Sequence, residues 1–231
     1  DPLAIDKPLI AHWPFDEAFA RGCLDASGND HDAALRSGKP QNAGRVPGLF
    51  GTALALAGRH RLAVEEGPDF ARCQQLTLSA WVMPRAFEKY NEIFRKEDGT
   101  NRVLFSFQEE GTILSLGLNI GGYVECDAPI DPQAVLDGRW HHCAATFDGQ
   151  SMRVFLDGRE IHKLERAGKI VAGGTADGCI GSSGGNECFQ GLIDELRIYS
   201  EAASEDEIAR LYRNGAEAYV RLAENQPADE P

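Results

Sequence analysis

Paired carboxylates are the side chains of this sequence that could support catalysis most directly, because glycoside hydrolysis needs two of them beside one bond. Two pairs of adjacent glutamates occur among the 36 acidic residues, Glu65-Glu66 and Glu109-Glu110. A retaining mechanism places its two carboxyl groups about 5–5.5 Å apart on one surface. Neighbouring residues on a strand point to opposite faces of a sheet, so neither pair meets that requirement. We therefore expect no catalytic residues and no enzymatic activity, and a glycoside hydrolase is the weakest alternative.

Exposed aromatic rings are the second group of side chains that could support a function, because the apolar face of such a ring can stack against a sugar. Tyr90 lies in the polar segment EKYNE, and Tyr123 directly follows two glycines. These two tyrosines are the candidate ligand-binding residues. The tryptophans occur in apolar strand patterns, which are typical of a core: Trp13, Trp81 and Trp140. The sequence thus allows carbohydrate binding without locating the site firmly.

Histidine and cysteine spacing offers no metal centre. His141 and His142 are neighbours, so on a strand they face opposite ways and cannot bind one ion together. We expect one of them to pack between sheets and the other to lie outside. None of the six cysteines stands in a CxxC pair, so a zinc site is not predicted.

The elements that position these residues are short strands. Leu114, Leu116, Leu118 and Ile120 alternate with polar or small residues, which places four apolar side chains on one face of a strand. Asp157-Gly158 is a strong signal for a two-residue hairpin turn. Strands at this density, without intervening helices, indicate an all-β antiparallel sandwich. The alternation predicts that the following side chains fill the space between two sheets: Trp81, Phe105, Leu116, Trp140, Val154 and Leu196.

One helix is expected near the C-terminus. Ser204 and Glu207 have the spacing of a capping box, and Asn214-Gly215 is a helix-ending pair. After it the chain becomes acidic and contains two prolines, which is typical of a linker. We therefore divide the chain into a lead-in over residues 1–8, one domain over 9–215 and a tail over 216–231.

Composition limits the partners. The net charge of −13 repels nucleic-acid phosphates and anionic lipid, so neither is expected as a partner. No apolar run approaches the length of a membrane span, so no membrane insertion is expected. The chain begins at Asp1, without an initiator methionine or a signal peptide. We therefore expect it to be part of a larger, multidomain protein.

Several segments resemble the laminin-G-like, concanavalin-A-like jelly-roll family, in the order in which that family has them. The segments are LIAHWPFDEA (9–18), LDASGNDHDAAL (24–35), VPGLFGTALALAG (46–58), LTLSAWVMP (76–84), GRWHHCAATFDGQSMRVFLDGREI (138–161) and FQGLIDELRIYSEAASEDEIARLY (189–212). Together they cover most of residues 9–212. The resemblance implies a two-sheet jelly roll in an extracytoplasmic setting. Two functions remain open: a module that binds a glycan or a protein surface, and a purely structural spacer.

A structural calcium ion is implied by the same resemblance. In this fold the two termini meet, and related sandwiches hold calcium there. Asp16, at the end of the first strand, and Asp194, in the last long strand, are the expected carboxylate ligands. Calcium takes six to eight oxygens, so backbone carbonyls must complete the shell, and Gly51 is the expected donor because glycine allows a close approach.

Disulfides are expected because the family is usually extracytoplasmic. A hairpin centred near residues 134–135 would place Cys126 opposite Cys143, at a separation close to what a disulfide needs. Cys179 and Cys188 flank a predicted turn and form a second candidate pair. Cys23 and Cys73 remain. The alternative is that some of the six are buried free thiols, which pack as small apolar groups.

Overall fold

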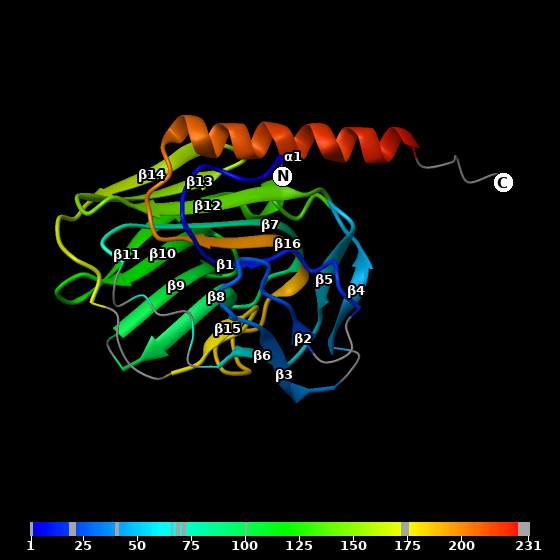
Figure 1. The fold of residues 1–231 in the computed structure, drawn as a ribbon, viewed down its shortest axis with the longest axis horizontal. Helices are drawn as coiled ribbons and strands as arrows, with labels where there is room; N and C mark the ends of the chain where they lie inside the picture. The colour runs from blue at the N-terminus through cyan, green and yellow to red at the C-terminus, as the bar shows by residue number, and fades with distance from the viewer. Residues whose placement is uncertain are drawn as a thin grey trace.

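Two antiparallel sheets form the body of the protein, as the alternating strands predict (Figure 1). The computed structural model describes residues 2–18, 22–39, 42–65, 67, 70, 73–99, 101–171 and 176–225. The predicted all-β sandwich is confirmed.

Each sheet has eight strands among the described residues. We call the first one sheet A. Its order is β14 (Arg159–Glu165), β13 (Ser151–Leu156), β12 (His141–Phe147), β7 (Leu76–Ala86), β16 (Gln190–Tyr199), β5 (Thr52–Leu56) and β4 (Ala43–Pro47), with β1 (Leu9–Trp13) also paired to β16. Sheet B has the order β11 (Tyr123–Pro129), β10 (Ile113–Asn119), β9 (Asn101–Gln108), β8 (Tyr90–Asp98), β15 (Gly178–Ile180), β6 (His60–Val64), β3 (Ala33–Gly38) and β2 (Gly22–Cys23). A short 3-10 helix, Pro132–Ala134, follows β11.

Period-two alternation accounts for the core between the sheets. Leu114, Leu116 and Leu118 are fully buried in it. Four of the six predicted core residues belong to this same cluster: Phe105, Leu116, Val154 and Leu196. The predicted β13–β14 hairpin also forms, and its turn residues Asp157 and Gly158 both have the positive φ that such a turn requires.

The prediction was wrong for two tryptophans. Trp81 and Trp140 are buried, but they belong to a second apolar cluster on the outer face of sheet A. This cluster also contains Leu3 and Ile5 from the predicted lead-in and Ile208 from the C-terminal helix. The helix and the N-terminal segment thus give sheet A a second buried face.

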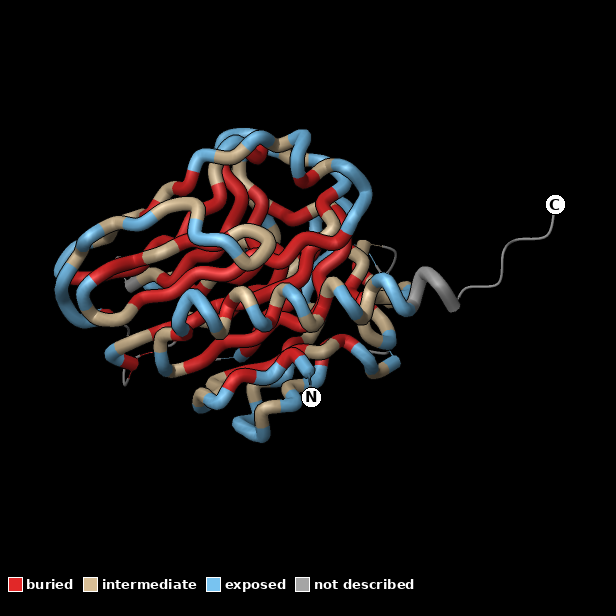
Figure 2. The backbone as a smooth tube through the Cα atoms, turned by 90° about the horizontal axis from the view of Figure 1, so that it is seen from above, coloured by how far each residue is buried: buried red, intermediate tan, exposed pale blue. Residues whose placement is uncertain are grey.

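The helix α1 (Glu205–Asn225) lies across the outer face of sheet A (Figures 1 and 2). Its capping box is confirmed, with the Ser204 backbone N–H donating to the Glu207 carboxylate at 2.8 Å. The predicted end at Asn214-Gly215 was wrong, because the helix continues for ten residues beyond Gly215. Gly215 serves packing instead, since its Cα faces the Trp81 indole at a distance that leaves no room for a side chain.

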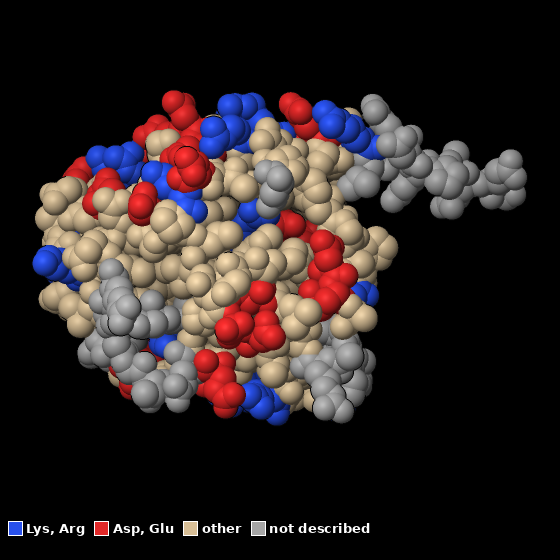
Figure 3. Space-filling view, in the orientation of Figure 1, with Lys and Arg blue, Asp and Glu red and all other residues tan. Residues whose placement is uncertain are grey.

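Charge is spread unevenly over the surface. Acidic side chains gather in patches on the face drawn in Figure 3, and acidic and basic side chains alternate along its upper edge near α1. Within the part of the chain that the structure describes, no helix combines the length and apolar character needed to cross a membrane.

The cysteine pairing was wrong. Cys126 lies on β11 of sheet B, opposite Leu116, whereas Cys143 lies on β12 of sheet A, opposite Ala80. The chain passes from one sheet to the other between these strands, so the hairpin on which the pairing depended does not form. All six cysteines are buried thiols outside any disulfide, as in the alternative interpretation: Cys23, Cys73, Cys126, Cys143, Cys179 and Cys188.

Candidate cation site and polar sheet face

The three predicted calcium ligands lie around one turn, residues 48–52. Asp16 accepts a hydrogen bond from the Thr52 backbone N–H at 2.9 Å. Asp194 accepts from the backbone N–H groups of Leu49 and Phe50 at 2.8 and 3.2 Å. Gly51 has φ of +59°, and a side chain there would collide with the Asp16 carboxylate. The fold therefore brings two carboxylates, distant in sequence, to the two ends of a glycine-containing turn.

The electrostatics of this turn suit a cation. Asp194 is fully buried, and its Oδ1 has no hydrogen-bond partner. Burial, with a contribution from the adjacent Glu195 charge, raises the pKa of Asp194 to about 8. An unpaired buried carboxylate oxygen is costly unless an ion or a proton compensates it. The donor set, carboxylate and carbonyl oxygen, fits a hard cation such as calcium.

Side chains alone do not complete this site. Among the described residues, no three or more His, Cys, Asp or Glu side chains group as a metal site. A calcium ion held by Asp16 and Asp194 would therefore take its remaining ligands from backbone carbonyls and water. The calcium site stays a prediction.

The outer face of sheet B carries a continuous polar network, which we call the sheet B face. Tyr123 packs its ring over Gly117, where a side chain would collide with it, and its hydroxyl donates to Glu125 at 2.6 Å. The Arg102 guanidinium lies 4.4 Å from the Tyr123 ring centroid. Gln108 donates to the same Glu125 at 3.0 Å. These side chains come from β9 and β11 and hold one another in fixed positions.

One arginine anchors the other half of the sheet B face. Arg95 donates to Glu92 at 2.6 Å, to Glu187 at 2.7 Å and to Glu97 at 2.8 Å. Glu97 also pairs with Arg102, which links this cluster to the Tyr123 group. Glu92 is only 1% exposed, and burial raises its pKa to about 8, despite the adjacent Arg95 charge. Three carboxylates share two guanidinium groups here, so we expect the deepest one, Glu92, to keep its proton.

A cavity of about 360 Å³ opens beside this cluster. Arg95 and Glu97 form one side, and Arg61 and Asp177, which are paired at 2.6 Å, form the other. Guanidinium donors and carboxylate acceptors in fixed positions can hydrogen-bond the hydroxyl groups of a sugar. The Tyr123 ring lies further along the same face, against Gly117 and the Arg102 guanidinium. The arrangement can therefore bind a hydroxyl-rich ligand.

The two candidate tyrosines do not share a site. Tyr90 begins β8 and pairs with Gln108, whereas Tyr123 begins β11 and pairs with Asn119 at the other end of the sheet. Tyr90 contacts the Lys89 ammonium, 5.3 Å from its ring centroid. Only Tyr123 belongs to the polar network. No local sequence pattern pointed to its partner Arg102. Arg102 and Gln108 do follow the two-residue period of one strand face, as do Tyr123 and Glu125.

Both histidines are buried. His142 lies outside the space between the sheets, because it pairs with Trp81 on the outer face of sheet A. His142 shares a 2.8 Å hydrogen bond with Ser79, and burial lowers its pKa to about 4. His141 lies between Asp157 and Asp137, at 2.9 and 3.0 Å. These two carboxylates outweigh desolvation and raise the pKa of His141.

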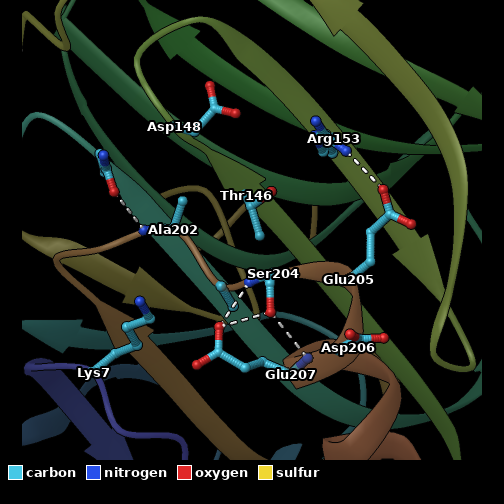
Figure 4. A pocket seen from close by; sticks show the side chains of 11 residues that line it. Lys7, Thr146, Asp148, Arg153, Ala202, Ser204, Glu205, Asp206 and Glu207 are labelled. Carbon is cyan, nitrogen blue, oxygen red and sulfur yellow. Dashed lines mark hydrogen bonds and ion pairs between the residues drawn. The ribbon is translucent and has the colours of Figure 1, made fainter.

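Two further features have a structural explanation. A cavity of about 510 Å³ lies at the start of α1 (Figure 4), where Ser204 and Glu207 form the helix cap and Glu205 pairs with Arg153 at 2.8 Å.

The segment 181–185 reads GSSGG and matches the spacing of a serine nucleophile elbow. An elbow needs a strand followed by a helix, whereas here β15 leads into a turn closed by Ser183 and Asn186.

Comparisons with known proteins agree with this architecture. A laminin G family model described as "Concanavalin A-like lectin/glucanases superfamily" matches residues 57–209, more than half of the chain. Domain 4 of AbnA, an extracellular arabinanase from Geobacillus stearothermophilus solved with arabinotriose, superposes with a TM-score of 0.72 at 22% identity, covering 90% of this chain and 100% of that one.

Other similar structures also carry the fold. The CBM40 of the Ruminococcus gnavus IT-sialidase, solved with α2,6-sialyllactose, has a TM-score of 0.53 at 15% identity and covers 64% of this chain and 93% of its own. The binding domain of Paraclostridial Mosquitocidal Protein 1 has a TM-score of 0.67 at 15% identity, covering 92% of this chain and 52% of that one. Human Pentraxin-4 is 23% identical over 193 residues, which are 78% of this chain but only 40% of Pentraxin-4. The chain thus spans less than half the length of this curated relative.

Proposed function

This chain belongs to the concanavalin A-like lectin/glucanase superfamily, and from that premise we propose that it is a non-catalytic, glycan-binding module of a larger extracytoplasmic protein. The sheet B face is the observation that carries the proposal. Its guanidinium and carboxylate groups are fixed by mutual hydrogen bonds before any ligand arrives, which lowers the entropic cost of binding. Relatives of this fold were solved with arabinotriose and with sialyllactose.

Two carboxyl groups do meet on this face, but their setting opposes catalysis. Glu92 and Glu187 both bond to Nη1 of Arg95. A glycosidase needs both groups free to approach opposite sides of one bond. Here the guanidinium occupies the space between them, and Glu92 is buried. This pair supports the polar network and leaves binding as the function that the geometry favours.

We further propose that calcium is a structural part of the module. Asp16 and Asp194 would hold it with their carboxylates and Gly51 with its carbonyl. The ion would supply the positive charge that the unpaired Oδ1 of Asp194 needs. It would also fasten the first strand and the last strand to the 48–52 turn.

Calcium removal tests this part of the proposal. At a hundred times its dissociation constant the ion adds about 2.7 kcal/mol to the free energy of unfolding, which raises the melting temperature of a chain of this size by roughly 5–10 °C. The Asp16→Asn variant should lose most of that difference, and Asp194→Asn should lose it as well if it folds. Equal melting temperatures of the native chain in chelator and in excess calcium would show that no such ion contributes.

Glycan binding itself is tested on an array of defined oligosaccharides. The intact chain should bind a restricted set of glycans. Tyr123→Ala should reduce that binding at least tenfold, because losing the ring that positions Arg102 and the hydrogen bond to Glu125 costs about 1.5–3 kcal/mol. Tyr90→Ala is the matched control, since it removes a tyrosine of the same sheet outside the network. A chain that binds no glycan above background would favour the alternative, a structural spacer. The projection of α1 beyond the sheets in Figure 1 is the feature that favours that alternative.

A further inference from the structure

The opposite side of the sandwich holds an aromatic cleft, between α1 and the outer face of sheet A. Trp81 and Trp140 form its base, and Tyr212 and Tyr219 of the helix form its wall. The cleft has a volume of about 350 Å³. It contains two of the three tryptophans of the chain. This face is separate from the sheet B face and from the 48–52 turn.

Packing of the helix explains why the cleft stays open. At Gly215 the helix backbone touches the Trp81 indole, and the Tyr212 ring stacks on the same indole at 5.9 Å, with 18° between the planes. The next residue, Ala216, has a small side chain and lines the cleft together with Trp140. Tyr219 closes the far end of the cleft. The aromatic side chains are therefore held in place by the helix contact itself.

Charged groups line the mouth of the cleft in a balanced set. His141 lies at its edge and is held by Asp157 and Asp137. Arg139 also lines the cleft and donates to Asp137 at 2.6 Å. Both ring nitrogens of His141 lie against carboxylate oxygens, which only accept hydrogen bonds, so this geometry requires the imidazolium form. In that form the two cations balance the two carboxylates. The mouth thus offers hydrogen-bond donors and acceptors without a net charge.

We propose that this cleft is a second saccharide site, which accepts one or two rings of a neutral sugar. The proposal takes its ligand class from the proposed function but places it at a different site. The partly exposed Tyr212 and Tyr219 rings match the apolar face of a sugar ring, above the buried Trp81 and Trp140. Arg139 and Asp157 match its hydroxyl groups. A volume at the small end of the range for ligand sites, about 300–1,000 Å³, favours a short ligand. The balanced charge favours a neutral sugar over an anionic one.

A module with sites on both faces would be bivalent. Two weak sites on one rigid body raise the avidity for a branched or surface-bound glycan without any new contact. The sheet B face and the aromatic cleft lie on opposite sides of the sandwich, so they would bind separate chains. The module would then cross-link glycan strands.

Tryptophan fluorescence tests the cleft directly. Trp13, the third tryptophan, is fully buried and donates its indole N–H to the His31 carbonyl at 2.8 Å, so it should not respond. The probes are cellobiose, maltose, xylobiose and arabinobiose, titrated to high millimolar concentrations against the intact chain. At least one should shift the emission of Trp81 and Trp140 in a saturable way. Tyr219→Ala should weaken that response about tenfold, and Tyr123→Ala should leave it unchanged.

The outcomes separate this inference from the proposed function. Array binding that Tyr123→Ala removes, together with no saturable fluorescence change for any of the four probes, would overturn the second site and keep the first. A fluorescence response that Tyr219→Ala leaves intact would also overturn it. If α1 is disturbed by Tyr219→Ala, Arg139→Ala replaces it, because that side chain is exposed and its loss leaves the helix unchanged. An array without any bound glycan and a saturable cleft response would overturn only the sheet B face.

Discussion

Gly215→Ala should destabilise the protein, although the same change in the middle of an ordinary helix stabilises it. Helix propensity alone favours alanine by about 1 kcal/mol. In this structure, however, an added Cβ would lie 2.6 Å from Cε2 and 3.0 Å from Cη2 of Trp81, and closer still to Cζ2. The indole is confined by Tyr212 and His142, whose ring centroids lie 5.9 and 5.2 Å from its own. The helix must therefore move outward by about 1 Å.

The expected size follows from the cost of overpacking. Forcing an extra methyl group into a packed site costs about 1–3 kcal/mol. A contact this close with a confined ring belongs at the upper end of that range, about 2–3 kcal/mol, which exceeds the propensity gain. We expect a net loss of about 1–2 kcal/mol, which lowers the melting temperature by roughly 2–8 °C. Urea or thermal denaturation of the intact chain measures it. The double variant Gly215→Ala with Trp81→Phe should recover part of the loss, because the smaller ring admits the methyl group. A more stable Gly215→Ala protein would show that α1 does not pack on Trp81 as described.

Three other predictions concern titrating groups. His141→Gln should lower the free energy of unfolding by about 2–3 kcal/mol at pH 5.5, as expected for lost hydrogen bonds to a charged group. Because the pKa of His141 is raised in the folded state, the difference between the variant and the native chain should shrink as pH rises above 7. A difference independent of pH would refute the charged interaction. Glu92→Gln should change stability little at pH 4.5 and stabilise the protein increasingly towards pH 8, by at most about 3–5 kcal/mol. The reason is that the Glu92 carboxyl ionises in this pH range in the unfolded chain, whereas in the folded protein, with a pKa of about 8, it does not. Chemical denaturation at several pH values measures the effect. A destabilised Glu92→Gln protein would mean that Glu92 is ionised in the fold. Thiol titration of the unfolded, unreduced chain should count six free thiols, and a count of four or fewer would contradict the free cysteines.

Local patterns in the sequence predicted the parts of the fold that depend on neighbouring residues. The alternation at Leu114, Leu116 and Leu118 identified a core face, because side-chain direction on a strand depends only on position. Asp157-Gly158 identified a hairpin, because the type of a two-residue turn depends on those two residues alone. Resemblance predicted that Asp16, Gly51 and Asp194 lie together, and the structure brings both carboxylates to the turn that contains Gly51. The calcium ion itself stays a prediction.

Features that depend on which surface covers a strand were not predictable in this way. Alternation places Trp81 on one face of β7 but does not say whether that face meets sheet B or the helix. Asn214-Gly215 is typical of a helix end. The packing role of Gly215 was not visible because its partner, Trp81, is 134 residues away in the sequence. The pairing of Cys126 with Cys143 assumed that consecutive strands form a hairpin, whereas the chain crosses to the other sheet between them.

The sheet B face was missed because its network joins residues that are distant in sequence. Arg95 holds both Glu92, three residues before it, and Glu187, 92 residues after it. No single strand shows that these groups converge. A polar residue on alternate positions of several strands was the available signal, but it is also typical of an ordinary solvated face.

A crystal structure of the intact chain with the oligosaccharide that binds best on the array tests the central claim most directly. We expect the sugar on the outer face of sheet B, with a ring against Tyr123 and hydroxyl groups within hydrogen-bond distance of Arg102 or of the cavity between Arg61 and Arg95. The bound oligosaccharide should remain intact. A sugar bound only elsewhere on the molecule, or a cleaved product beside Glu92 and Glu187, would contradict a non-catalytic glycan-binding module that uses this face.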